Sequence, residues 1–382
     1  MIRLLRGIRT FLLTIVGRSR LAQSVVASRC RPSGVELRSR RDELLLTSGG
    51  RSIQLHPKHL PFAPDVARRF DAYYFSRSLT EVDSVPVVDY SSPHDLLVMR
   101  RVERAGASLR YAEGVFRLQK DNRVMLLQRR HFIYVADLAE DFDTYFSPIV
   151  PLEEDGLLVV DYSRPGILQT YRSSGLQFEM PSFPEQEEAI DEYFRWYRPK
   201  PGDTVFDMGA HCGVSTCLLA GMVGPQGRVV AFEPDPLNFN LLVRNLDRHG
   251  HSNVTALNIA VSSTNGTAPF HCEGTVGSGL ASVIKRDTAG STVDVETVTL
   301  AEAFVRWGQP VFCKIDIEGA EIGVLASSKD ILSAHKIHIA LDTHHFVNGV
   351  LTTKAVERML RSYGYDTASN RNPFATTWAR PK

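Results

Sequence analysis

The chain has 382 residues, too many for one ordinary domain and enough for two or three. Hydrophobic residues make up 43% and charged residues 23%, so a globular core can form without disulfides or metals. The formal net charge of +1 argues against a general nucleic-acid binder, because neutralising phosphates requires a basic surface.

The amino-terminal segment, residues 1–34, is basic and amphipathic. Residues 1–41 contain ten arginines and a single acidic residue, Glu36. The apolar run Phe11–Val16 is too short to span a bilayer, and it makes a poor signal peptide. Three interpretations stay open: peripheral membrane contact through residues 1–26, an organelle transit peptide, and an additional helix or tail. Five scattered cysteines fit a reducing compartment, so we expect a cytoplasmic protein, with a membrane-peripheral or organelle location as alternatives.

A repeat with an offset of 72 residues follows. Residues 51–93 align without gaps on residues 123–165, with 16 of 43 positions identical, which is unlikely by chance. We interpret the segment 35–181 as an α+β accessory domain of two copies, at about 35–106 and 107–178. The predicted strands are Ser52–Leu55, Val85–Val88, Val124–Leu127 and Leu157–Val160, and the helix-like stretches are Pro64–Phe75 and Ala136–Phe146.

Strands and helices alternate in the remaining domain, residues 182–382, after a bridging helix at Glu185–Arg198. This alternation predicts an α/β fold, a Rossmann-like and mostly parallel sheet with helices on both faces. A β-rich insertion is expected between about Thr267 and Val298. Ligands of such sheets bind outside the carboxyl ends of the strands. The predicted strands that end at candidate site residues are Thr204–Met208, Arg228–Glu233, Asn253–Ile259, Val311–Ile317 and Ile337–Thr343.

The first chemical motif is Asp207-x-Gly209-Ala210-His211-x-Gly213, between a predicted strand and a predicted helix. Its glycines allow a tight turn with close backbone approach to a ligand. Glu233 ends the next strand, 26 residues beyond Asp207, where an acid can accept hydrogen bonds from ribose hydroxyls. A dinucleotide pyrophosphate prefers a loop without an acid. The carboxylate of Asp207 therefore favours the cationic methyl donor S-adenosylmethionine over a dinucleotide.

Three motifs together resemble the FkbM-type methyltransferases, a class I family, over residues 184–380. They are the Asp-x-Gly-Ala loop, Ala231-Phe-Glu-Pro-Asp-Pro236 and, most specifically, Lys314-Ile-Asp-Ile-Glu-Gly-Ala-Glu321. The resemblance implies S-adenosylmethionine as cofactor, with Asp316 beside the transferred methyl group. The cofactor-binding residues that it implies are Asp207, Gly209, Ala210, His211, Gly213, Glu233, Pro234, Asn258, Ala260 and Asp316.

A hydroxyl acceptor must lose a proton when it is methylated, so we looked for a base near the strand ends. After the fifth strand the chain reads Leu341-Asp-Thr-His-His345, where the family usually has a glutamate and then a histidine. His344 is the first candidate base and Asp316 the second, while His345 is expected to lie on the surface or to be structural. Asp316, Asp342 and His344 are an alternative divalent-metal site, but the acids are not diagnostic and we assign no metal ligand.

The acceptor-binding residues are the least defined. Glu318 is expected to face the site and Glu321 to be structural. Ser278, in a flexible segment that suits a lid, and Asp342 are further substrate-contact candidates. We expect O-methylation of a glycan or small-molecule hydroxyl. A methyltransferase that uses the repeats to dock a macromolecule, and a non-catalytic module that retains the fold, remain alternatives.

Overall fold

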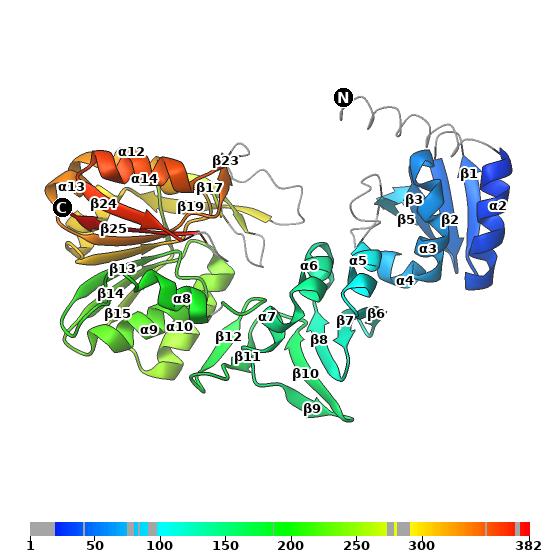
Figure 1. Ribbon diagram of the computed structural model, residues 1–382, viewed down its shortest axis with the longest axis horizontal. Coiled ribbons are helices and arrows are strands. Elements are labelled where there is room, and N and C mark those ends of the chain that lie inside the picture. Colours follow the sequence, from blue (N-terminus) through cyan, green and yellow to red (C-terminus); the bar gives the residue numbers. More distant parts are fainter. Residues whose placement is uncertain are drawn as a thin grey trace. The chain divides into compact units, whose positions relative to one another are not determined.

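The computed structural model describes residues 20–40, 43–74, 80–82, 85–90, 98–185, 187–272, 279–280, 291–347, 350–370 and 375–382. The chain divides into two compact units, Met1–Phe146 with Pro151–Ser163, and Ser147–Val150 with Arg164–Lys382 (Figure 1). Residues 1–19 of the basic amino-terminal segment lie outside the described residues. Across the described ranges, no helix is long and apolar enough to cross a membrane.

The first unit contains two five-stranded sheets with the same strand order, β1-β2-β3-β5-β4 and β6-β7-β8-β10-β9. In each sheet the first three strands are antiparallel, and the third pairs in parallel with the fifth. The strands are β1 (Glu36–Arg40), β2 (Glu43–Ser48), β3 (Arg51–Leu55), β4 (Thr80–Val82), β5 (Val85–Tyr90), β6 (Ser108–Ala112), β7 (Val115–Lys120), β8 (Arg123–Leu127), β9 (Leu152–Glu154) and β10 (Leu157–Tyr162).

Corresponding elements of the two sheets lie 72 residues apart. Ser52 pairs with Val87 in the first sheet, and Val124 pairs with Val159 in the second. The single helix-like stretch predicted for each copy is a pair of short helices in both. The hairpins β1–β2 and β6–β7 were not predicted. The helices of this unit are α2 (Arg20–Cys30), α3 (Ala63–Arg68), α4 (Phe70–Tyr74), α5 (Val98–Arg104), α6 (Val135–Glu140) and α7 (Phe142–Phe146).

An arginine at the start of the third strand makes the same contacts in both copies. Arg51 forms an ion pair with Asp71 at 2.8 Å and stacks over the rings of Phe70 and Tyr74. Arg123 forms an ion pair with Asp143 and stacks over Phe142 and Phe146. The arginine and the aspartate are identical in the alignment, and in both sheets their ion pair holds a short helix against the third strand.

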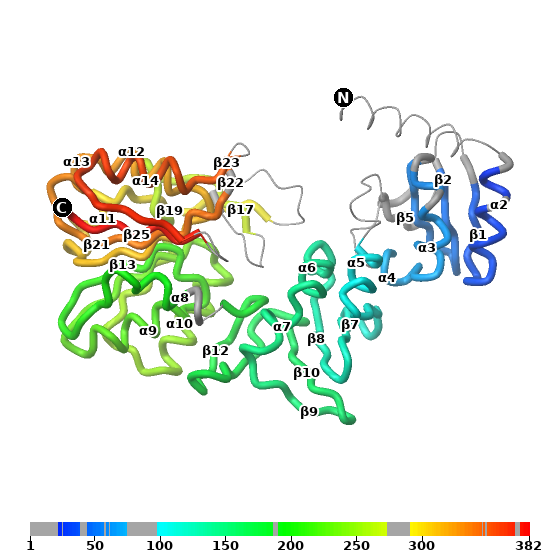
Figure 2. The backbone as a smooth tube through the Cα atoms, viewed as in Figure 1, coloured from blue at the N-terminus to red at the C-terminus, as the bar shows by residue number. Residues whose placement is uncertain are grey.

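The boundary between the units differs from the sequence division at residue 181. Residues 164–181 lie in the second unit, where they form the hairpin β11 (Ile167–Thr170) and β12 (Gln177–Met180). Figure 2 shows β12 beside α10 (Pro236–His249). Glu179 explains this packing, because its backbone exchanges hydrogen bonds with the Asn245 side chain, and its carboxylate pairs with Arg244 and Arg248.

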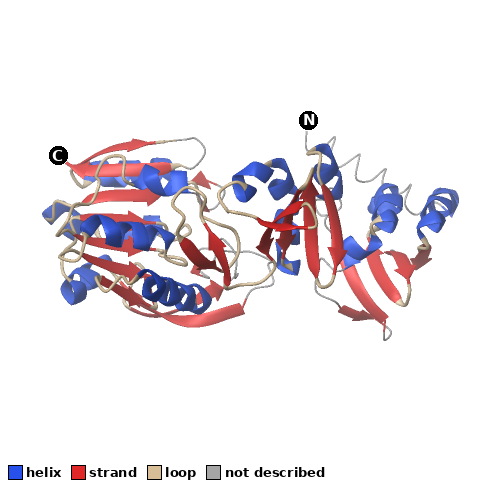
Figure 3. Cartoon of the chain, turned by 90° about the horizontal axis from the view of Figure 1, so that it is seen from below, coloured by secondary structure: helices blue, strands red, loops and turns tan. Residues whose placement is uncertain are grey.

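A seven-stranded sheet in the order β15-β14-β13-β20-β21-β25-β24 dominates the second unit, and its first five strands are parallel (Figure 3). The predicted α/β fold is confirmed. β25 runs antiparallel to both of its neighbours. The strands are β13 (Thr204–Met208), β14 (Arg228–Phe232), β15 (Val254–Leu257), β20 (Phe312–Ile315), β21 (His338–Asp342), β24 (Tyr365–Ser369) and β25 (Thr376–Pro381).

Helices cover both faces of this sheet (Figure 1). On one face, Phe206, Phe304, Val324 and Leu360 belong to a single buried core. α8 is shorter than the predicted bridging helix. The helices of this unit are α8 (Glu187–Tyr193), α9 (Val214–Val223), α10, α11 (Leu300–Trp307), α12 (Glu321–Ser327), α13 (Lys329–Ala334) and α14 (Thr353–Ser362).

The predicted β-rich insertion contains a separate sheet in the order β16-β19-β17-β18. Its strands are β16 (Ile259–Val261), β17 (Gly266–Cys272), β18 (Gly279–Leu280) and β19 (Ser291–Val298). Ser278, expected in a lid, lies outside the described residues. A short hairpin, β22 (Phe346–Val347) with β23 (Val350–Leu351), follows the fifth strand of the parallel sheet.

Candidate active site

The predicted site residues follow the carboxyl ends of parallel strands of the large sheet. The strand order reverses between β13 and β20, which lie side by side at the centre of that sheet. A crevice at such a reversal is where open α/β sheets bind ligands. The fold therefore brings the cofactor loop after β13 next to Asp316 after β20.

Gly209 is required at the first turn of the loop for two reasons. Its φ is +81°, and a Cβ atom there would lie 1.8 Å from the backbone oxygen of Asp316. Gly213, with φ +95°, precedes α9, and a Cβ atom there would lie 2.6 Å from a side-chain carbon of Leu242. The buried Ala210 donates its backbone N–H to the carbonyl of Phe232. The loop is thus packed tightly against both neighbouring strands.

The Asp207 carboxylate supports this loop from the protein interior. The side chain has no exposed surface and accepts hydrogen bonds from Ser215 and Thr216 of α9, at 2.9 and 2.7 Å. Its Oδ1 lies 3.1 Å from Nζ of Lys314, which also donates to the Gly209 carbonyl at 2.7 Å. Opposing the cost of burial, the charges of Asp207 and Asp316 raise the Lys314 pKa. Asp207 thus binds groups that shape the loop, and no part of it is exposed to a ligand.

Glu233, directly after β14, lies across the loop from Asp207. One carboxylate oxygen accepts the backbone N–H of His211 at 2.8 Å, and the other accepts that of Asp235 at 2.9 Å. Burial raises the pKa of Glu233 to about 7. Asn258 donates to the carbonyls of Glu233 and Pro234, at 2.8 and 3.0 Å. These contacts fix the carboxylate of Glu233 beside the loop at the end of β14.

Ala260 lies away from this group of polar residues. Its side chain is buried with Phe270, Val295 and Ala320 in the core of the insertion, and its backbone pairs with Thr297 in β19. Of the two predicted cofactor-binding residues after the third strand, Asn258 is therefore exposed and Ala260 is not.

The segment that precedes the large sheet contributes two residues that the sequence did not single out. Glu185 lies 2.7 Å from Nδ1 of His211, a loop residue whose φ is +51°. Tyr193, in α8, donates its hydroxyl to Oδ2 of Asp316 at 3.2 Å, and the Lys314 ammonium lies 5.5 Å from its ring centroid. Sequence spacing could not reveal the Tyr193 contacts, because α8 lies more than 100 residues before Lys314 and Asp316.

Asp316 follows β20, and 31% of its side chain is exposed. Burial of the carboxyl group and the charge of Asp342 raise its pKa to about 7. Asp342 ends β21 and accepts the backbone N–H of His344 at 2.9 Å. Its Oδ1 also lies 2.5 Å from Nδ1 of His344, whose side chain is 51% exposed. This hydrogen bond to Asp342 raises the pKa of His344.

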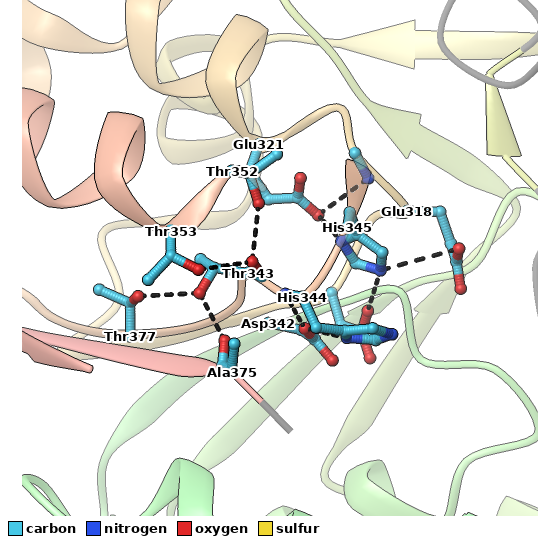
Figure 4. A network of polar contacts seen from close by, with 12 residues as sticks. Glu318, Glu321, Asp342, Thr343, His344, His345, Thr352, Thr353, Ala375 and Thr377 are labelled. Carbon is cyan, nitrogen blue, oxygen red and sulfur yellow. Dashed lines mark hydrogen bonds and ion pairs between the residues drawn. The ribbon is translucent and has the colours of Figure 1, made fainter. Parts of the chain in front are cut away.

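His345 points inward, whereas its neighbour His344 is half exposed (Figure 4). Its Nδ1 lies 3.1 Å from Glu321, and its Nε2 lies 3.7 Å from Glu318 and 3.8 Å from Asp316. Burial opposes its charge, but Glu321 and the other two carboxylates outweigh burial and raise its pKa to about 10. Glu318 is partly exposed, whereas Glu321 is fully buried. A signal for His345 was available, since two adjacent histidines cannot both point the same way from an extended segment.

Metal-ligand atoms gather in three places among the described residues, each within a span of 4.8 Å. The three groups are Glu185, His211 and Cys212; Asp342, His344 and His345; and Asp316, Glu318 and His345. The set that the sequence left as an alternative metal site, Asp316 with Asp342 and His344, is therefore divided between the last two groups.

Comparison with known proteins agrees with these motifs. Residues 207–367 match the family model described as the methyltransferase FkbM domain. None of the curated proteins compared with the chain matches it. Among solved structures, the chain is similar to a methyltransferase FkbM from Methylobacillus flagellatus KT, with 19% identity, a TM-score of 0.37, and coverage of 51% of this chain and 50% of that one. The chain thus spans about half the length of that protein.

Two further structures are similar over the same share of this chain. A precorrin-6y C5,15-methyltransferase from Geobacter metallireducens GS-15 has 16% identity and a TM-score of 0.36, covering 52% of this chain and 90% of that one. A SAM-dependent methyltransferase from Aquifex aeolicus has 15% identity and a TM-score of 0.31, covering 50% of this chain and 87% of that one.

Proposed function

We propose that the protein transfers a methyl group from S-adenosylmethionine to a hydroxyl oxygen, because residues 207–367 match the family model of the methyltransferase FkbM domain. The acceptor class that we propose is a glycan or a small molecule. The observation that carries this proposal is the meeting of the glycine loop, Glu233 and Asp316 at the strand-order reversal of the large sheet.

The residues around Glu233 suit a ribose-bearing cofactor. Each carboxylate oxygen of Glu233 accepts one backbone N–H, and a carboxylate has further lone pairs with which to accept hydroxyl groups. Gly209 and Gly213 let the loop turn close to the sheet. When bound, S-adenosylmethionine supplies an electrophilic methyl group on its sulfonium. The chain's part is to align the acceptor with that group, which can contribute roughly 7–11 kcal/mol to lowering the barrier.

His344 is the residue that we propose as the general base. A hydrogen bond between Nδ1 and Asp342 holds the ring and makes Nε2 the nitrogen that accepts the hydroxyl proton. Asp342 is therefore a positioning residue. Its side chain is shorter than that of glutamate, and it reaches the histidine two residues later, His344. Asp316 remains the second candidate base, because its raised pKa lies near neutrality.

Isothermal titration of the full chain with S-adenosylmethionine tests the cofactor. We expect binding by wild type and a clear loss of affinity in Glu233→Ala, with Glu154→Gln as a control on an exposed strand of the first unit. No binding by folded wild type, or undiminished binding by Glu233→Ala, would overturn the cofactor assignment.

Mass spectrometry after incubation with hydroxyl-bearing sugars and small alcohols tests the acceptor atom. We expect S-adenosylhomocysteine together with an O-methylated product. His344→Gln should reduce kcat by about 10²–10⁴-fold while the affinity for S-adenosylmethionine is kept. A methylated nitrogen or carbon, or a His344→Gln rate near wild type between pH 6 and 8, would exclude the corresponding part of the proposal.

A further inference from the structure

The imidazole of His345 is held in one orientation by a fully buried acid. Only 8% of the His345 side chain is exposed, and its Nδ1 lies 3.1 Å from Oε1 of Glu321. The same oxygen accepts the backbone N–H groups of Ile317 and Gly319, at 3.3 and 3.2 Å. A carboxylate bound to one imidazole nitrogen is the usual support of a histidine whose other nitrogen binds a metal ion.

The other nitrogen of His345 faces two carboxylates, and both distances are too long for hydrogen bonds. Both ring nitrogens are buried without a hydrogen bond, and whereas Nδ1 forms an ion pair with Glu321, Nε2 lies 3.7 Å from Glu318 (Figure 4). Nε2 also lies 3.8 Å from Asp316. Hydrogen bonds to nitrogen have lengths of about 2.7–3.2 Å. Three atoms at this spacing, within 4.8 Å of one another, are roughly 2.2–2.4 Å from a common centre, a length typical of bonds to divalent cations.

The two oxygens of Asp316 have separate surroundings. Oδ2 accepts the hydroxyl of Tyr193 at 3.2 Å, and Oδ1 is the oxygen that faces His345. Tyr193 therefore orients the carboxylate as Glu321 orients the imidazole. Asp316 and His345 therefore each contact a supporting residue through the atom that does not face the shared centre.

The two other groups of ligand atoms are already closed by hydrogen bonds. Asp342 and His344 are 2.5 Å apart, and Glu185 and His211 are 2.7 Å apart, which leaves no room for an ion between them. Among the residues that the structure describes, the group around Nε2 of His345 is different. Its carboxylates lie 3.7 and 3.8 Å from Nε2, farther than a hydrogen bond.

We propose that Asp316, Glu318 and His345 bind a divalent transition-metal cation, with Glu321 as a positioning residue. Two carboxylates and one imidazole suit ions such as Mn²⁺. The cation holds the oxygen of the acceptor hydroxyl beside the methyl donor and favours loss of its proton to His344. This role rests on the proposed function, whereas the ion site itself rests on the geometry alone.

Binding of Mn²⁺ to the full chain, after chelator treatment and dialysis, tests the site. Electron paramagnetic resonance of free Mn²⁺ and isothermal titration are expected to give one ion per chain. Asp316→Asn, Glu318→Gln and His345→Gln should each weaken binding at least tenfold, and Glu321→Gln about 10–100-fold with the stoichiometry kept. Thermal unfolding of every variant establishes that it is folded.

His344→Gln is the matched control, because it changes the adjacent histidine. Unchanged Mn²⁺ affinity in this variant supports the site, and loss of binding there with retention in Glu318→Gln would overturn it. Absence of a stoichiometric ion in folded wild type that binds S-adenosylmethionine would also overturn it and leave the proposed function standing. Mn²⁺ binding without S-adenosylmethionine binding would leave the site and remove the proposed function.

Discussion

Nζ of Lys314 lies 3.1 Å from Oδ1 of Asp207, and both side chains are buried beneath the cofactor loop. The pair joins the first and fourth parallel strands, and Lys314 also donates to the carbonyl of Gly209. A buried charge that loses its partner is expensive. The pair therefore couples the shape of the loop to the stability of the sheet.

We expect Lys314→Met to lower the free energy of unfolding of the second unit by about 3–5 kcal/mol, because Asp207 would be left as an uncompensated buried charge. Chemical denaturation followed by far-UV circular dichroism measures this loss. The double variant with Asp207→Asn should be more stable than the sum of the single effects predicts. Additive effects in this cycle would contradict the coupling.

Gly209→Ala should disrupt the tightly packed loop between β13 and α9. The new Cβ atom would lie 1.8 Å from the carbonyl oxygen of Asp316 at a backbone position with φ +81°. We expect a lower melting temperature and loss of S-adenosylmethionine binding in isothermal titration. Gly221→Ala, in α9, is the matched control, since no atom lies within 4 Å of its added Cβ and alanine favours the helix. Equal effects of the two substitutions would refute this explanation of Gly209.

Affinity for S-adenosylmethionine should depend on pH through Glu233. Its pKa is raised to about 7, so the carboxylate that we propose as the acceptor of ribose hydroxyls predominates above this pH and is lost below it. We expect the association constant to fall below pH 7, approaching tenfold per pH unit. Isothermal titration between pH 5.5 and 8.5 measures the change.

Glu233→Gln supplies the control for this dependence. The amide does not titrate, so its weaker binding should vary much less over the same range. The loss at pH 8 should be about 1.5–3 kcal/mol, as for hydrogen bonds to a charged group. A wild-type affinity that stays constant from pH 6 to 8 is the result that this prediction forbids.

The two arginines of the first unit should be of similar importance. Arg51→Ala and Arg123→Ala each remove an ion pair with an exposed aspartate and contacts with two aromatic rings. We expect each to lower the free energy of unfolding by about 1 kcal/mol. The exposed Arg110→Ala, in β6, should have little effect. Strongly unequal losses for Arg51 and Arg123 in denaturation experiments would show that the copies differ at this contact.

Periodicity predicted most of the large sheet because each parallel strand is a short apolar run that ends in a polar motif. α10 and α11 each begin after a side-chain cap, at Asp235 and Thr299, a start signal that can be read from the sequence. The hairpins β1–β2 and β6–β7 escaped prediction, because charged residues interrupt their apolar alternation.

Several predicted site residues lie at the ends of the parallel strands, whereas Ala260 is buried in the core of the insertion, and their contacts are ones that sequence spacing does not encode. Asp207 was expected to meet a cationic ligand, and its partner is Lys314, more than 100 residues away. His344 and His345 are adjacent in sequence, yet one is half exposed on Asp342 and the other is buried among three acids. Burial of a polar side chain is a property of the packed fold, so a motif alone does not reveal it.

The common register of the two sheets in the first unit has a consequence for how the chain folds. β3 pairs in parallel with β5, with Ser52 opposite Val87, and β8 pairs in parallel with β10, with Val124 opposite Val159. The register of β5 on β3 is therefore the same as that of β10 on β8, so either strand could pair at the position of the other. We therefore expect refolding to have a competing product in which the two sheets exchange this strand, a hazard typical of tandem repeats. Sequence differences between the copies act against the exchange, so substitutions that made β5 and β10 more alike should slow correct folding.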